Sequence, residues 1–188
     1  EQHLPGYLPN DEIWEIDATY EDQNLPAIFL EKEVENQPTE SYFTKTDIVT
    51  GEPVEGAKLQ ILDEEGTVVR EWITTKEEHL EYALLAGNYI LHEELPPLED
   101  GYVSAEDVSF EVKEDGTITK VEMKDDFSKV DISKTDITGD TELVGVKLQV
   151  LNSKEEVLDE WISDGTEHRI EYLPVGEELT LRETQTIS

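Results

Sequence analysis

Short apolar stretches that alternate with polar residues recur along the whole chain. They are rich in Val, Ile, Leu, Thr and Tyr, and turn signals such as DEEGT (63–67), LEDGY (98–102) and KEDGT (113–117) separate them about every 8–12 residues. Because successive side chains of a strand point to opposite faces, a period of two predicts half-buried strands. No segment keeps a helical apolar period over about ten residues. The pattern therefore predicts an all-β chain.

The best-defined unit covers residues 41–128. We expect it to be a seven-strand antiparallel sandwich of the immunoglobulin-like or prealbumin-like type. Strands of this length are usual in small β domains. The predicted strands are 41–48, 57–63, 67–75, 78–85, 88–94, 106–113 and 117–125.

A long stretch of the sequence occurs twice. YFTKTDIVTGEPVEGAKLQIL (42–62) returns as DISKTDITGDTELVGVKLQVL (131–151), so that Lys45 and Lys134 lie 89 residues apart. A repeat of this period is a whole domain, longer than the unit of a solenoid or a propeller. The chain is therefore expected to contain sandwich modules in tandem.

The register of the repeat continues past both ends of the complete unit. PGY near the start of the chain corresponds to DGY at 100–102, and the last residues stop before a DGY of their own. We therefore expect residues 1–40 to be the C-terminal half of a preceding module. Residues 41–128 would form a complete module, and residues 129–188 the N-terminal half of a following one.

Composition excludes several classes of partner. Asp and Glu outnumber Lys and Arg by 47 to 14, and the net charge of −33 repels nucleic acid and anionic lipid. No apolar run approaches the length of about 18 residues that a transmembrane helix needs. The opening EQHLPGYLPNDE lacks the basic and apolar regions of a signal peptide. We expect neither nucleic-acid nor membrane binding.

Cysteine is absent, which excludes disulfides and thiol chemistry and disfavours zinc. Apolar residues make up 36% of the chain and aromatic residues 7%, enough for small cores. The absence of cysteine does not identify the compartment, but an extracellular protein without disulfides would need a stabilising constraint of another type. The sequence offers a candidate for it.

Three predicted inward-facing stripes end in an ionisable residue: Lys45 in the first strand, Glu93 in the fifth and Asp125 in the last. A buried, unpaired charge is costly, so such groups should pair or become neutral. Burial lowers the pKa of an amine and raises that of a carboxyl group. A neutral Lys45 could then attack a protonated Asp125 while Glu93 moves the protons, giving an amide and water.

Two simpler interpretations of the same pattern stay open. Charged residues often end inward stripes at a solvated sheet rim, and Lys45, Glu93 and Asp125 could also form a non-covalent cluster. Perturbed ionisable sites are often merely structural.

Several motifs resemble the CnaB-type domain, the prealbumin-like or SpaA-type module of Gram-positive surface adhesins and pilins. They are KTD, EGAKLQIL, EWI, YILHEE, DGY and MKD. In that family a lysine of the first strand bonds an Asp or Asn of the last strand, assisted by a glutamate. The resemblance implies a crosslink between Lys45 and Asp125 with Glu93 as proton shuttle, although a second acid, Glu94, follows directly.

The same motifs recur in the two partial units. The resemblance implies that Lys134 and Glu183 are the lysine and glutamate of the third unit. It also implies that Asn36 is the acceptor of the first unit, where ammonia rather than water would leave. The departures from the family pattern are the adjacent Glu94 and a longer approach, LPPLED, to the DGY motif.

No metal or cofactor site is expected. Asp136, Asp140 and Glu142 could attract calcium weakly, but their spacing fits no EF-hand loop. Charged neighbours of His79 and His168 suggest a turn rather than a ligand set.

Trp72 and Trp161 follow a glutamate in the repeated EWI motif. We interpret them as packing anchors rather than as platforms on which sugars stack. They are therefore not assigned to a sugar-binding site.

We therefore expect a structural stalk or spacer of a cell-surface adhesin or pilus, located outside the cell at the wall. It would crosslink itself once and would not be an enzyme. Its partners would be neighbouring repeats of the same protein, with head-to-tail self-complementation between chains as a further hypothesis. Excision from a longer array would also explain the half-modules. The alternatives are a module that binds host protein or glycan through its loops and, less favoured, a hydrolase; the sequence identifies no host ligand.

Overall fold

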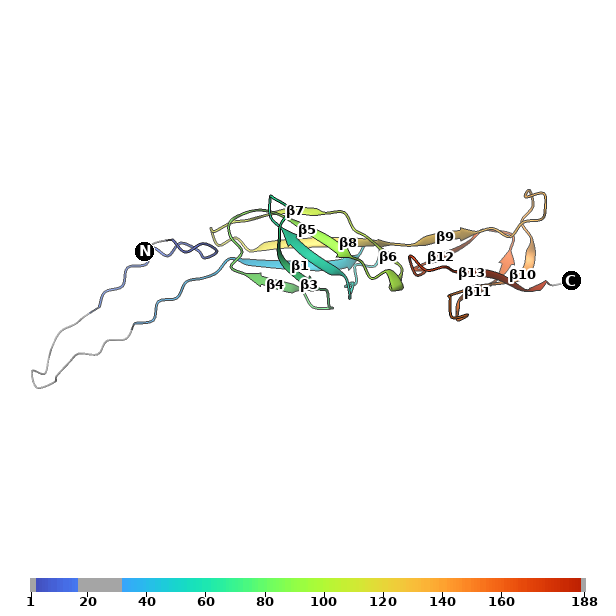
Figure 1. Cartoon of the computed structure of the whole chain (residues 1–188), viewed down its shortest axis with the longest axis horizontal. Coiled ribbons are helices and arrows are strands. Elements are labelled where there is room, and N and C mark those ends of the chain that lie inside the picture. Colours follow the sequence, from blue (N-terminus) through green and yellow to red (C-terminus); the bar gives the residue numbers. More distant parts are fainter. Residues whose placement is uncertain (1–2, 17–31, 187–188) are drawn as a thin grey trace, which may run out of the picture.

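The computed structural model describes residues 3–16 and 32–186. The described chain divides into an N-terminal segment (3–16 and 32–38), a central module (39–127) and a C-terminal module (128–186). These three parts succeed one another along the long axis in Figure 1. Apart from the single turn of 3₁₀ helix η1 (Leu98–Asp100), the regular structure described is β. The predicted all-β class is confirmed. Within the described ranges no helix has the length and apolar character that crossing a bilayer requires.

The central module is a sandwich of two four-stranded sheets. One sheet has the order β4-β1-β8-β6 and the other the order β3-β2-β5-β7. Their bounds are β1 (Glu40–Asp47), β2 (Lys58–Leu62), β3 (Val68–Ile73), β4 (His79–Tyr82), β5 (Gly87–Leu95), β6 (Tyr102–Val103), β7 (Val108–Val112) and β8 (Thr119–Phe127).

The predicted strands match these bounds to within a few residues, with two differences. The two-residue β6 adds an eighth strand to the seven expected, because the turn at LEDGY leads directly into a short pairing with β8. The pairing of β1 with β8 is parallel, although an antiparallel sandwich was expected. The first and last strands thus run side by side in the same direction.

Alternation along the strands places the core of the central module between the two sheets. Every second residue of β1 and of β8 is buried. Half-buried Trp72, Tyr89 and Phe110 pack around the core. Its buried apolar members are Phe43, Ala57, Leu59, Ile61, Leu84, Leu91, Val112, Val121 and Met123.

The C-terminal module contains the counterparts of the first five strands of the central one. Its sheets have the orders β12-β9 and β11-β10-β13. A smaller core of Val150, Ile170 and Leu173 lies between them. The bounds are β9 (Lys129–Ile132), β10 (Val144–Leu151), β11 (Val157–Asp164), β12 (His168–Glu171) and β13 (Thr180–Thr186).

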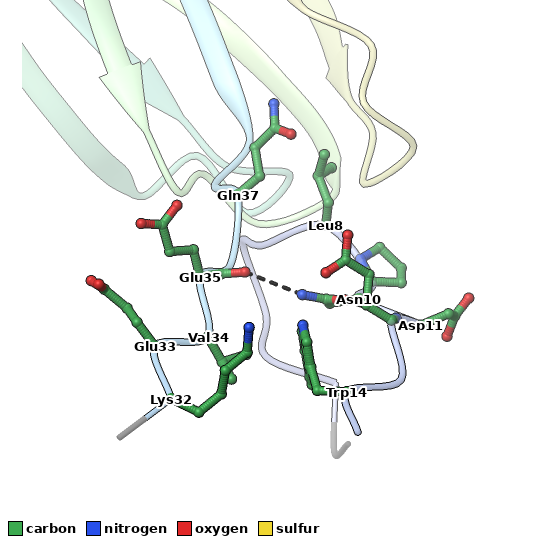
Figure 2. Close-up of a pocket in the computed structure, with 11 residues that line it drawn as sticks. Leu8, Asn10, Asp11, Trp14, Lys32, Glu33, Val34, Glu35 and Gln37 are labelled. Carbon is green, nitrogen blue, oxygen red and sulfur yellow. Dashed lines mark hydrogen bonds between the residues drawn. The ribbon is translucent and has the colours of Figure 1, made fainter. Parts of the chain in front are cut away.

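The N-terminal segment consists of two extended stretches that lie side by side. Tyr7 pairs with Pro38 in an isolated antiparallel bridge, and Asn10 Nδ2 donates a hydrogen bond to the carbonyl oxygen of Glu35 at 3.1 Å (Figure 2). A pocket with Trp14 on its wall lies between the two stretches. The expected half-module at 1–40 falls partly outside the described residues.

Candidate functional site

Three strands of the central module bring Lys45, Glu93 and Asp125 together. Lys45 lies on β1 opposite Met123, two residues before Asp125 on the neighbouring β8. Glu93 lies on β5 in the other sheet. Period-two alternation turns all three side chains into the space between the sheets, as the sequence predicted. We call these residues the triad.

The triad is almost completely shielded from solvent. The side chain of Lys45 is 1% exposed, and those of Glu93 and Asp125 are 0% exposed. Lys45 Nζ lies 2.9 Å from Glu93 Oε1 and is also in contact with Asp125 Oδ1. The amine therefore lies between two carboxyl groups, in a site that excludes bulk water.

The contacts within the triad have the distances of ion pairs but not the alignment of hydrogen bonds. Lys45 Nζ, Glu93 Oε1 and both carboxyl oxygens of Asp125 are buried without a well-aligned hydrogen bond. A buried ion pair offsets the loss of its hydration only when hydrogen bonds accompany it. The protonated form of Asp125 loses far less hydration than its carboxylate, so burial favours the neutral acid at this position.

Glu93 is held in place by the backbone. The amide of Ala105 donates a hydrogen bond to Glu93 Oε2 at 2.7 Å, while Oε1 faces Lys45. The pattern of the sequence did not indicate this donor, because Ala105 lies in the loop between β6 and β7. With one oxygen fixed, the other is free to exchange a proton with the amine.

Burial raises the pKa of Asp125 to about 6, while the adjacent Lys45 acts in the opposite direction. Burial favours the neutral carboxylic acid, whose hydroxyl group an amine can displace. Chemically, the triad contains a nucleophile, an electrophile and a proton carrier within contact distance. It can support condensation of Lys45 with Asp125.

The predicted residues of the partial units are less enclosed. Lys134 Nζ lies 3.2 Å from Glu183 Oε2, with side chains that are 30% and 37% exposed. Asn36 lies in the N-terminal segment and lines a pocket with His3 and Leu8. The structure thus places Lys134 beside Glu183, and Asn36 in a different part of the molecule.

The repeated Trp and His residues form stacked pairs. The rings of Trp72 and His79 lie 4.0 Å apart and those of Trp161 and His168 lie 4.2 Å apart, nearly parallel in both cases. The histidines begin strands β4 and β12, so the expectation of a turn was wrong, because strand pairing extends to them. Phe43 packs against Trp72, consistent with a role in packing.

Sequence reasoning assigned no role to Asp47, although it lies on the same face of β1 as Lys45. Asp47 is 2% exposed and is paired in register with Asp125. The sequence indicates that Asp47 is buried only through its position, two residues after Lys45 on the same face of the predicted strand. Its contacts, described below, come partly from the C-terminal module.

Comparison with known proteins places the fold in a family. The model of the SpaA domain, described as a prealbumin-like fold domain, matches residues 40–126 and again residues 128–188. No curated protein matches the chain.

The chain is also similar to several solved structures. The Bacillus anthracis TIE protein has a TM-score of 0.53 and 26% identity over 81% of this chain and 30% of that chain. A streptococcal ancillary pilin has a TM-score of 0.41, with 19% identity over 81% of this chain and 56% of that chain. The shaft pilin SpaA from Lactobacillus rhamnosus GG has a TM-score of 0.40, with 13% identity over 79% of this chain and 88% of that chain. The chain thus spans about a third of the first of these proteins and about half of the second.

Proposed function

We propose, because the chain belongs to the family of SpaA prealbumin-like domains, that it is a structural spacer of a Gram-positive cell-surface protein. Its central module would be stabilised by an intramolecular amide bond between Lys45 and Asp125. The observation that carries this proposal is the enclosed triad, with the amine of Lys45 in contact with Asp125 and 2.9 Å from Glu93.

The proposed reaction is a condensation that the module performs once on itself. Lys45 Nζ, as a neutral amine, attacks Cγ of the protonated Asp125 and forms the new carbon–nitrogen bond. Glu93 accepts a proton from the attacking nitrogen and delivers it to the departing hydroxyl of Asp125. One carbon–oxygen bond breaks and one water leaves, so atoms and charges balance.

Proximity and desolvation lower the activation barrier that free side chains would face. When a fold holds the reacting groups in contact, the barrier can fall by up to about 7–11 kcal/mol relative to groups that must meet in solution. The triad lies on three different strands, so this arrangement exists only after the sandwich has formed. The reaction would therefore follow folding.

The proposed bond suits a protein that bears tension. It would join β1 to β8, the first and last strands, which are parallel neighbours. Force applied to the two ends of the module would then pass through the bond, and the strands between them would carry little load. This is a mechanical role, in keeping with a spacer rather than an enzyme.

Intact mass tests the proposal directly. We expect the purified full chain to weigh about 18 Da less than its sequence mass, since one water is lost per Lys–Asp bond. Peptide mapping should find Lys45 joined to Asp125. The variants Lys45→Ala and Asp125→Ala should both have their full sequence mass.

Lys58→Ala is the matched control. Lys58 also contacts a carboxylate, Glu94, at 2.6 Å, but its side chain is 33% exposed. This variant should keep the mass deficit of the unaltered protein. Folded protein with an unmodified mass and with free Lys45 and Asp125 would disprove the crosslink.

A further inference from the structure

The chain passes between its parts at two places, which we call the first and the second junction. At the first junction the amide of Thr39 donates to the carbonyl of Gly6 at 2.9 Å. The amide of Ala83 donates to the carbonyl of Thr39 at 3.0 Å, and the Thr39 hydroxyl donates to the carbonyl of Leu84 at 2.6 Å. Thr39 is thus bonded to segments that lie before and after it in the sequence.

The second junction repeats these three hydrogen bonds around Ser128. Its amide donates to the carbonyl of Gly101 at 2.8 Å, and its carbonyl accepts from the amide of Tyr172 at 3.1 Å. The Ser128 hydroxyl donates to the carbonyl of Leu173 at 2.7 Å. Because the same arrangement occurs at both ends of the central module, we regard it as encoded by the repeat.

Close backbone approach makes each junction specific. Gly6 and Gly101 have φ of +83° and +84°, and a Cβ at either would lie 2.7 Å or less from the backbone of Ala83 or Tyr172, respectively. Ala83 and Tyr172 themselves have φ of 56° and 58°, a region that side chains disfavour. Such backbone persists only where surrounding contacts fix it.

The two junctions differ in the side chain that occupies this strained position. At the first junction Ala83 presents only a methyl group. At the second, the ring of Tyr172 stacks on Phe127 with 3.9 Å between centroids and lies edge-on to Tyr102 at 5.7 Å. The Tyr172 hydroxyl donates to Asp47 Oδ2 at 2.8 Å.

Asp47 is a buried carboxylate that depends on donors from two modules. The amides of Val49 and Thr50, in its own module, both donate to Oδ1 at 2.8 Å. Burial acts to raise the pKa of Asp47, but these hydrogen bonds and that from Tyr172 hold it below its usual value. The end of the central module is therefore completed by a phenol from the next one.

The first junction has a different reinforcement. Glu114 accepts hydrogen bonds from the amide of Gly6 at 2.8 Å and from His3 at 2.7 Å. No described residue at that junction takes the place of the Tyr172 ring, so aromatic packing is particular to the second junction among the residues that the structure covers.

We propose that Asp47, Tyr102 and Phe127 form a docking surface for a following module that carries a tyrosine at the position of Tyr172. Docking fixes the orientation of the two modules and replaces a flexible linker by a rigid joint. The identity of the residue at positions 83 and 172 sets how firmly each junction is held. The inference goes beyond the crosslink and does not require that Lys45 react.

The test compares the full chain with its Tyr172→Ala and Tyr172→Phe variants by ¹⁵N relaxation and amide hydrogen exchange. In the unaltered protein the central and C-terminal modules should share one rotational correlation time. In Tyr172→Ala they should tumble separately, and the amides of Ser128 and Val175, which donate across the junction, should exchange at least about tenfold faster. Tyr172→Phe, which keeps the ring, should produce a smaller acceleration at the same amides.

Tyr82→Ala is the matched control, because Tyr82 is 52% exposed on β4. It should leave the relation of the two modules unchanged. Separate tumbling of the modules in the unaltered protein would overturn the proposal, and so would equal exchange in the unaltered, Tyr172→Phe and Tyr172→Ala proteins. If Tyr172→Ala unfolds the C-terminal module, Tyr172→Phe decides the question alone. Repeating the comparison with Lys45→Ala separates docking from the crosslink.

Discussion

Two adjacent glutamates of β5 have opposite environments. Glu93 faces the core and is held by the amide of Ala105, whereas the side chain of Glu94 is 46% exposed and pairs with Lys58 at the surface. Strand alternation alone creates this difference, since neighbouring side chains point to opposite faces. The pair therefore offers an internal comparison for the proposed proton transfer.

Glu93→Gln should slow or abolish formation of the Lys45–Asp125 bond, whereas Glu94→Gln should not. An amide side chain fills the same space as a carboxylate but cannot accept a proton from the amine. The measurement is the fraction of protein that weighs about 18 Da less than its sequence mass, because one water is lost, followed over time after purification. Equal yields in the two variants would remove Glu93 from the mechanism.

A second prediction concerns pH. In Lys45→Met no bond can form, and the amine that lowers the pKa of Asp125 is gone, so the folded pKa should be 6 or higher. The folded pKa of Asp125 then lies above its pKa in the unfolded chain. Protonated Asp125 therefore makes its full contribution to stability below about pH 4, and this contribution is lost as pH rises through the folded pKa. A difference of two pKa units corresponds to about 3 kcal/mol.

The measurement is the urea midpoint of Lys45→Met between about pH 4 and pH 7. Adding Asp125→Asn should remove this part of the pH dependence, because an amide does not titrate. If both proteins lose stability equally as pH rises, the acidic surface rather than Asp125 is responsible.

At the residue scale, the sequence predicted the inward-facing ionisable groups well. Lys45, Glu93 and Asp125 follow apolar residues at a spacing of two, and that spacing is local information. The contacts of Asp47 with Tyr172 could not be predicted, because they join residues of different modules through a strained turn. Local patterns carry no information about such contacts.

At the scale of the strands, alternation and turns predicted where the strands lie but not how all of them pair. The bounds of β1 and β8 were expected almost correctly, since each is a clear period-two stretch between turns. Their parallel pairing depends on how the whole chain is wound, which the local pattern does not specify. The short β6 was missed because two residues cannot establish a period.

The proposed crosslink between β1 and β8 should contribute strongly to the thermal stability of the central module. It would close a loop of about 80 residues, worth about 4–5 kcal/mol by the chain-entropy argument. For a domain of this size we expect the unfolding midpoint of Lys45→Ala to fall by about 20 °C or more.

Differential scanning calorimetry measures this loss, with Lys58→Ala as the control. Lys58 contributes a surface ion pair, and such pairs contribute little. A midpoint for Lys45→Ala within a few degrees of the control would contradict a covalent constraint.

At the scale of the whole molecule, we propose that the C-terminal module is the first part of a sandwich and that the N-terminal segment contains the last part of another. Lys134, which follows β9, lies beside Glu183, and by the repeat its acceptor corresponds to Asn36. A second copy could then supply its N-terminal segment as an added strand.

This proposal predicts head-to-tail oligomers that survive denaturation. Concentrated protein should form them slowly, with a loss of about 17 Da per bond as ammonia leaves. They should be absent in Lys134→Ala and in Asn36→Ala and present in the control Lys147→Ala. Denaturing gel electrophoresis and light scattering measure them, and a strict monomer at high concentration would contradict the proposal.

The parallel placement of β1 and β8 also bears on how such a protein leaves the cell. A chain exported from its N-terminus through a narrow channel must remain unfolded while it passes, and a closed covalent loop would block it. Lys45 emerges early, but Asp125 lies on the strand that emerges last. The proposed bond could therefore form only after the complete module has left the channel, so the order of the strands would keep each module transportable until its own export is finished.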